Sequence, residues 1–159
     1  MEPRFIIDKN VGKLAKWLRM MGYDAVLFDE IDDGRMVKQA LSQDRTIITK
    51  DSGFMKRRAI TTGRIKATLV KGDDPEKQMQ TVIHTLKLDS EFKPFTRCLE
   101  CNSELLPRER RQVADTVPPR VYEIQDKYME CPACHRIFWR GTHWQAMSDK
   151  LHQFGVVEL

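Results

Sequence analysis

The chain has 159 residues, of which 41% are hydrophobic and 31% are charged, a composition that supports a buried core and a soluble surface. The formal net charge of +4 fits a nucleic-acid partner, but it is equally typical of an ordinary basic protein. No apolar run approaches the roughly 20 residues of a membrane-spanning helix, and the first residues do not resemble a signal peptide. We therefore expect a cytoplasmic protein without a membrane partner.

Four short apolar segments in the first part of the chain have the composition of buried strands. They are separated by stretches whose apolar residues recur at helical spacing. Short apolar strands that alternate with helices predict an α/β fold. Its parallel sheet has helices on both faces and a Rossmann-type layout. The predicted strands span residues 5–7, 25–28, 46–49 and 67–70.

The helical stretches between these strands have recognisable ends. The first carries apolar residues from position 11 to position 21 and ends at Gly22, where a left-handed cap is expected. The second begins at Asp32 or Asp33, either of which can cap it. A short basic helix follows Asp51, and Pro75 can begin a fourth helix. A last helix is expected after the cysteine-containing segment.

All four cysteines fall into two Cys-x-x-Cys pairs, Cys98 with Cys101 and Cys131 with Cys134. Two such pairs predict one structural zinc ion held by four sulfurs, with no position left for water. Disulfides are unexpected without a secretory signal, a redox pair requires one motif instead of two, and an iron–sulfur cluster usually shows other spacings. We expect a zinc ribbon with a β-excursion between the pairs and a terminal helix, forming a domain over residues 94–159 after a first domain over residues 1–93.

Aspartates follow the predicted strands directly. Because the carboxyl ends of parallel strands meet at one edge of a sheet, we expect these side chains to lie near one another, where ligand sites of open α/β folds form. Grouped carboxylates require a cation, and oxygen ligands suit Mg²⁺ or Mn²⁺, which can activate water for phosphodiester cleavage. Taken singly, each aspartate is better explained as a turn former or helix cap. The residues are Asp8, Asp29, Asp51 and either Asp73 or Asp74.

Basic residues flank the expected acidic edge, as a polyanionic substrate such as RNA requires. The predicted substrate-binding residues are Lys13, Lys16, Arg57 and Arg58. A solvated helix face explains any one of them equally well. The tryptophans can stack on bases, although core packing is the simpler explanation for the tryptophan of the first helix. His143 can contact a phosphate or begin the last helix.

The segment from Asp8 to Arg19, followed by Gly22-Tyr23-Asp24, resembles the opening of the Mut-seven C-terminal ribonuclease family. Residues 45–51, the two cysteine pairs and residues 139–143 continue this resemblance, which covers almost the whole chain. The family's third-strand motif often has Arg where this chain has Lys50.

The resemblance implies a PIN-like nuclease domain with an appended zinc ribbon, which cuts RNA with the help of Mg²⁺ or Mn²⁺. By position, it implies that Asp8 and Asp51 are metal ligands. The middle acidic position maps to Asp29, Asp32 or Asp33, and the fourth maps to Asp73 or Asp74. We take Asp29 and Asp33 as predicted catalytic residues together with Asp8 and Asp51. PIN-like domains often form homodimers, so a dimer is expected as an alternative to a monomer, and no protein partner is indicated.

A metal-dependent ribonuclease is therefore the expected function, and two other functions stay open. The first is a non-catalytic RNA- or ribosome-binding zinc-ribbon protein, in which the ribbon is the docking surface. The second is a receiver-like signalling domain with Asp51 as the phosphate acceptor. Receiver domains need two adjacent acidic residues after the first strand, whereas here Lys9 follows Asp8.

Overall fold

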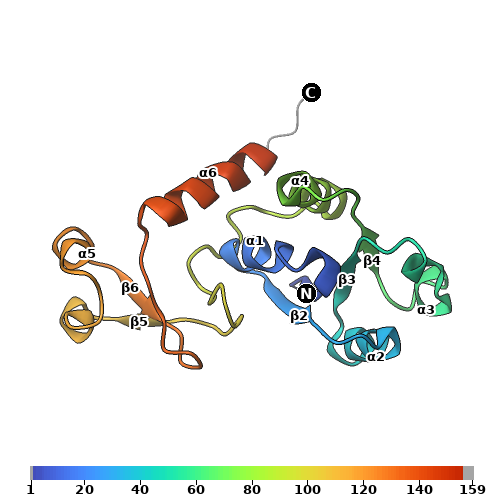
Figure 1. Cartoon of the computed structure of the whole chain (residues 1–159), viewed down its shortest axis with the longest axis horizontal. Helices are drawn as coiled ribbons and strands as arrows, with labels where there is room; N and C mark the ends of the chain where they lie inside the picture. The colour runs from blue at the N-terminus through green and yellow to red at the C-terminus, as the bar shows by residue number, and fades with distance from the viewer. Residues whose placement is uncertain (1, 156–159) are drawn as a thin grey trace.

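The four predicted strands pair side by side in one parallel sheet. The computed structural model describes residues 2–155 (Figure 1), and in it the strands follow the order β2-β1-β3-β4. Isoleucine pairs at the centre of β1 and β3 are completely buried, because helices cover both faces. The prediction of a parallel α/β sheet is therefore confirmed. The strands are β1 (Arg4–Asp8), β2 (Asp24–Phe28), β3 (Thr46–Thr49) and β4 (Ala67–Leu69).

Two apolar clusters lie on opposite faces of this sheet. On one face, α1 (Leu14–Met20), α4 (Pro75–Leu86) and α6 (Thr142–Gly155) pack against Phe5, Ile7 and Ile48. On the other, α2 (Asp33–Gln43), the 3₁₀ turn η2 (Phe54–Lys56) and α3 (Arg58–Thr61) pack against Ile6 and Ile47. None of the helices in residues 2–155 combines the length and the apolar character needed to cross a bilayer.

The ends of the helices match their expected signals, with one correction. Asp32 caps α2 by accepting hydrogen bonds from the backbone N–H groups of Gly34 and Arg35, and Gly22 adopts a φ of 97°. The expected continuous first helix is instead a 3₁₀ turn, η1 (Lys9–Val11), followed by α1. Gly12, a weak helix former, lies at the junction.

The second half of the chain forms a smaller antiparallel sheet. Its strands, in the order β5-β6-β7, are β5 (Leu106–Arg108), β6 (Tyr128–Glu130) and β7 (Ile137–Phe138). The β-excursion expected between the cysteine pairs is present as the paired strands β5 and β6, but the chain between these two strands is helical. It contains the turn η3 (Arg110–Val113) and α5 (Pro119–Ile124), which starts at consecutive prolines that favour a helix N-terminus. Val113, Val117 and Tyr128 give this excursion its own small core.

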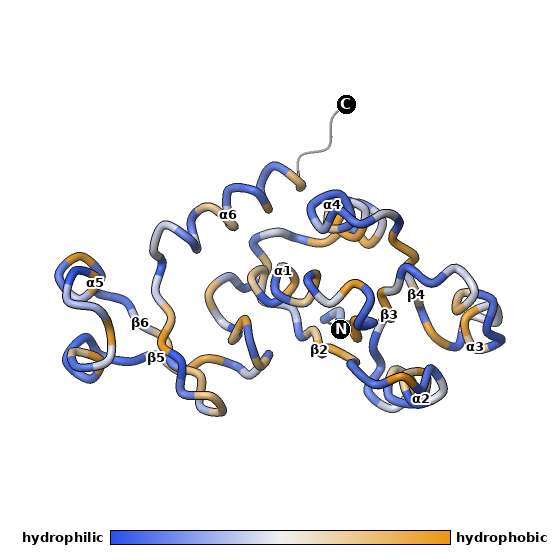
Figure 2. The backbone as a smooth tube through the Cα atoms, in the orientation of Figure 1, coloured by the Kyte–Doolittle hydropathy of each residue, from blue (hydrophilic) through white to orange (hydrophobic). Residues whose placement is uncertain are grey.

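The last helix returns from the small sheet to the first half of the chain. Figure 1 shows α6 lying beside α1 and α4, and its Leu151 and Phe154 are buried in the same cluster as those helices. Hydrophobic and hydrophilic residues alternate along α6 (Figure 2), as expected for a helix that packs on one side. The boundary after residue 93 stays a prediction. The packing of α6 ties the later segment to the earlier one.

A partly buried polar network joins the edge of the large sheet to the first cysteine pair. The Arg45 guanidinium donates to Asp24 Oδ1 at 2.8 Å, and Asn102 Nδ2 donates to the same oxygen at 2.7 Å. Asn102 Oδ1 accepts from the N–H of Ala25 at 2.9 Å, while Arg19 Nε donates to the Ala25 carbonyl at 2.9 Å. The outward-facing backbone groups of Ala25, in edge strand β2, are therefore satisfied by side chains instead of by another strand.

The neighbours of Asp24 in this network change the pKa of its carboxyl group. Burial raises the pKa of its carboxyl group, but the hydrogen bonds from Arg45 and Asn102 outweigh burial and hold the pKa below its usual value. Because the pKa of Asp24 is lower in the folded state than in the unfolded state, the ionised carboxylate stabilises the fold at any pH above the unfolded-state pKa. This contribution is lost as the pH falls through the folded-state pKa.

We expect Asp24→Asn to lower the free energy of unfolding at neutral pH by about 3 kcal/mol, because it leaves the nearly buried Arg45 guanidinium without a counter-charge. The deficit should shrink in acid, where Asp24 itself is protonated. Urea unfolding at neutral and acidic pH measures both effects. The control is Glu30→Gln, which removes the exposed Glu30–Arg35 pair and should cost less than about 1 kcal/mol. Equal losses in the two variants would contradict a special role for Asp24.

Candidate functional site

The carboxyl edge of the parallel sheet carries a short hydrogen-bonded chain made of the Asp8 and Thr49 side chains and the backbone N–H of Asp51. Asp8 ends β1, between β2 and β3, and its Oδ2 accepts a hydrogen bond from Thr49 Oγ1 at 2.8 Å. The same Thr49 oxygen accepts from the backbone N–H of Asp51 at 3.1 Å. Thr49 is completely buried and Asp8 is half-buried. The arrangement therefore fixes the Asp8 carboxylate and the start of the Asp51 loop with respect to each other.

The Asp51 carboxylate also shapes its own loop. Its Oδ1 accepts hydrogen bonds from the N–H groups of Gly53 at 2.9 Å and Phe54 at 3.2 Å. These bonds turn the chain from β3 into η2. Asp51 remains exposed, so the carboxylate keeps room for a further ligand.

The other candidate aspartates take different positions. Asp29 is exposed beyond β2, and the half-buried Asp33 lies 3.8 Å from the Arg57 guanidinium. Asp73 pairs with Lys50 at 3.0 Å, and Asp74 caps α4. Within residues 2–155, no three carboxylates bring their oxygens within 4.8 Å of one another. The structure thus links Asp8 to the Asp51 loop and pairs Asp33 with Arg57, while Asp29 stands apart from these contacts.

The four predicted substrate-binding residues differ in their surroundings. Lys13 precedes α1 and lines a cavity of about 330 Å³ beside the strand ends, together with Lys9, Lys50 and Asp73. Lys16 forms an exposed ion pair with Glu100 at 2.9 Å. Arg57 lies over the Phe54 ring at 5.3 Å, and Arg58 begins α3 and is exposed. Arg57 therefore lies beside the candidate carboxylate Asp33, and Lys13 lines the same cavity as Asp73.

The four cysteines converge as the spacing predicts. Their Sγ atoms all lie within 4.8 Å of one another, with separations of 3.5 Å for Cys98–Cys101, 3.7 Å for Cys98–Cys134 and 3.5 Å for Cys101–Cys131. A tetrahedral ion with metal–sulfur bonds of about 2.3 Å has sulfur–sulfur edges of about 3.8 Å. Both the donor set and its size therefore fit a zinc ion.

The two cysteine turns have the same backbone conformation and the same hydrogen bonds. In each, the N–H of the second cysteine donates to the Sγ of the first at 3.4 Å. The next residue, Asn102 or His135, has a positive φ of 69° or 64° and donates its N–H to the carbonyl of the first cysteine. These turns aim paired thiolates at one point, and Asn102 is also the residue that reaches Asp24.

The charges within the cluster call for a cation. The backbone N–H of Arg136 donates toward Cys134 and lowers the pKa of that thiol to about 6. Burial raises the pKa of the Cys101 thiol far above its usual value. Four thiolates at these distances repel one another, so the fully ionised set is stable only around a positive ion.

Two important residues escaped the sequence reasoning. The apolar pattern places Thr49 in a strand but gives its side chain no role, and nothing in the sequence marks Asn102. A threonine at the carboxyl end of an apolar strand, two residues before an aspartate, was a usable signal for the first. The contact of Asn102 with Asp24 spans 78 positions in sequence, and no local sequence pattern predicts it.

A family model described as the Mut7-C RNAse domain matches residues 3–151. The match includes the carboxyl edge of the large sheet, both cysteine pairs and most of α6. Comparison with curated proteins found no match, nor did comparison with solved structures. The resemblance noted in the sequence is confirmed, and the chain belongs to the Mut7-C RNAse domain family, which indicates a ribonuclease-type function.

Proposed function

We propose that this protein is a PIN-like ribonuclease that hydrolyses RNA phosphodiester bonds with a divalent cation held at the carboxyl edge of the sheet. The observation that carries the proposal is the Asp8–Thr49–Asp51 chain, in a protein of an RNase family. Carboxylate oxygens at this edge are the donors that Mg²⁺ and Mn²⁺ prefer, and one oxygen of Asp8 is already oriented by Thr49.

Each residue of the edge has a role in this proposal. Asp8 and Asp51 would hold the cation, which when bound supplies an activated water and stabilises the leaving oxygen. Thr49 positions Asp8 through its hydroxyl group and does not contact substrate. Asp29 and Asp33 stand as further acidic candidates. Lys13 and Arg57, one near each side of the edge, hold phosphate groups, with Lys16 and Arg58 farther out.

We also propose that the four cysteines hold a structural zinc ion. Support comes from the sulfur-only donor set, the matched turns and the size of the cluster. All four donor positions come from protein, which leaves none for a reacting water. Through Asn102, the ion would hold the first cysteine turn against the edge of the large sheet.

Cleavage of labelled single-stranded RNA in Mn²⁺ tests the nuclease directly. We expect Asp8→Asn and Asp51→Asn each to lower the cleavage rate at least about 100-fold, because each removes a negative oxygen ligand. The matched control is Asp44→Asn, which makes the same change at the exposed end of α2 and should retain full activity. If cleavage survives both changes, the carboxylate assignment is wrong. If no variant cleaves but RNA is still bound, the non-catalytic RNA-binding function replaces it.

Thr49→Val should lower the cleavage rate about tenfold and raise the Mn²⁺ concentration needed for half-maximal activity, because the near-isosteric side chain cannot donate to Asp8. Thr49→Ser keeps the hydroxyl group and should restore most of the metal response. A metal titration of activity in both variants separates positioning from packing. The same loss in Thr49→Ser would show that packing alone accounts for the effect.

Purified protein should contain one zinc ion per chain, and Cys131→Ser should lose it and loosen the fold of the small sheet, since a buried ligand is removed. Elemental analysis and thermal unfolding measure the two effects. Ala133→Ser introduces a hydroxyl group at an exposed position of the same turn and serves as the control. Full zinc content in Cys131→Ser would contradict the four-sulfur site.

A further inference from the structure

A row of three adjoining hollows, which share lining residues, follows the surface from the strand ends to the cysteine turns. Its middle part, of about 660 Å³, lies between α1 and α6. A second part of about 510 Å³ shares Lys16, His143 and Met147 with it and continues to β7 and Trp139. The cavity beside the strand ends shares Gly12 and Lys13 with the middle part. We name these three connected parts the α1–α6 groove.

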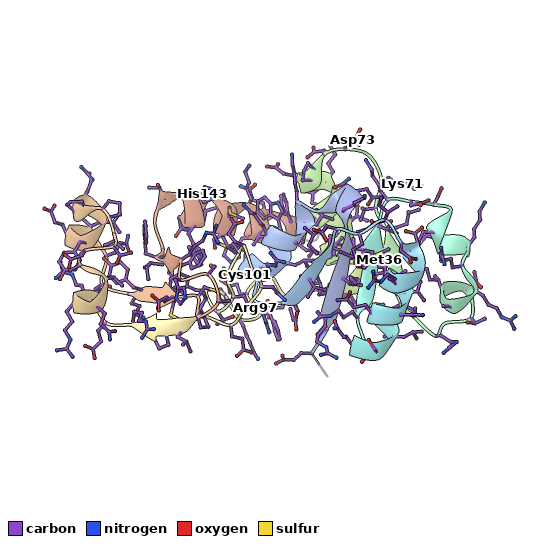
Figure 3. The ribbon with its side chains drawn as sticks, turned by 60° about the horizontal axis from the view of Figure 1, so that its bottom comes forward. Met36, Lys71, Asp73, Arg97, Cys101 and His143 are labelled. Carbon is purple, nitrogen blue, oxygen red and sulfur yellow. The ribbon has the colours of Figure 1, made fainter. Side chains whose placement is uncertain are left out.

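The rim of the groove is strongly basic. Three lysines that line it pair with carboxylates in the part of the chain that the structure describes. These pairs are Lys16 with Glu100, Lys50 with Asp73 and Lys150 with Glu76. The exposed Lys9, Lys13 and His143 form no ion pair with residues 2–155. Figure 3 shows His143 at the start of α6 and Asp73 before α4 along the same edge of the molecule. Lys9 and Lys13 thus carry unpaired positive charge, and an exposed pair such as Lys150–Glu76 is weak enough for the lysine to exchange its carboxylate for a phosphate, as binding of a polyanion requires.

The inner walls of the groove are apolar and aromatic. Trp17 and Met147 line the middle part, and Trp139 and Trp144 line the part beside β7. All four are half-buried, so each keeps an exposed surface. Unpaired bases stack on such surfaces, whereas the bases of a duplex are already stacked and turned inward.

We propose that the α1–α6 groove binds a single-stranded RNA segment and leads it from the candidate carboxylates to the cysteine turns. This inference rests on the proposed function, because one end of the groove is lined by Lys9 and Lys50, the chain neighbours of Asp8 and Asp51. Lys13 and Lys150 contact phosphates from opposite walls, and His143 stacks against a base. The cysteine-containing unit and α6 thereby form half of the substrate site, in addition to their structural role.

Equilibrium binding to single-stranded oligouridine tests the groove apart from catalysis. The measurement uses the full chain carrying Asp8→Asn and a fluorescent oligomer of about 12 nucleotides, a length within the range that single-strand binding sites cover. Lys13→Ala with Lys150→Ala should weaken binding at least about tenfold and reduce the slope of log affinity against log salt by about 1.4, since each lost phosphate contact removes about 0.7. Lys38→Ala with Lys66→Ala, a matched charge change at exposed sites outside the groove, should leave binding within about twofold.

His143→Ala should weaken binding about fivefold or more, and His143→Tyr should restore it, because a tyrosine ring can stack as a histidine ring does. A trinucleotide should bind weakly and respond little to these changes. Thermal unfolding of each variant checks that the exposed substitutions leave the fold intact. Equal weakening by the control pair, or equally tight binding of duplex RNA with the same sensitivity, would overturn the proposal.

The two proposals fail in different ways. Manganese-dependent cleavage by the otherwise wild-type chain, with groove variants that bind RNA normally, would keep the nuclease and reject the groove. Groove variants that lose RNA binding, in a protein without cleavage activity, would keep the groove and reject the nuclease.

Discussion

The interaction on which the rest of this structure depends is the contact between Asp24, Arg45 and Asn102. One carboxylate at the edge of the large sheet accepts from an arginine of the neighbouring loop and from the asparagine that follows the first cysteine pair. Asn102 simultaneously occupies the hydrogen-bonding position that another strand would take beside Ala25. The first cysteine turn thus covers the open edge of the large sheet. The hydrogen bonds of this contact connect the two halves of the chain, in addition to the covalent link between them.

The Asp24–Arg45–Asn102 contact influences the candidate site through β2 and its neighbour β1. Because β2 is fixed on its outer side, its pairing with β1 is held in register from Arg4 to Asp8, and Asp8 is presented at the carboxyl edge. The buried hydroxyl group of Thr49 then links Asp8 to the Asp51 loop. A carboxylate held in this way loses little conformational freedom when a ligand binds, which is the property that a metal or substrate site requires.

The sequence predicted the parallel sheet, the starts of α2 and α4 and the convergence of the cysteines, because local periodicity, capping and spacing determine these features. It also singled out Asp8 and Asp51 as strand-end residues, but it offered no means to rank Asp29 against Asp33. That choice depends on loop paths set by packing. The helical excursion before β6 was missed since its apolar residues are few. The roles of Asp24 and Asn102 were missed because they arise between segments far apart in the chain, whose meeting only the folded arrangement defines.

The position of α6 has a consequence for how the protein is made. Leu151 and Phe154 complete the same apolar cluster as Phe5 and Leu14, yet the ribosome synthesises them after the entire cysteine-containing segment. The large sheet, α1 and α4 can come together earlier in translation, but the part of this apolar face that Leu151 and Phe154 cover stays exposed until α6 has been made. The cysteine-containing segment is therefore made before the residues that complete the core, and its own folding can precede the packing of α6.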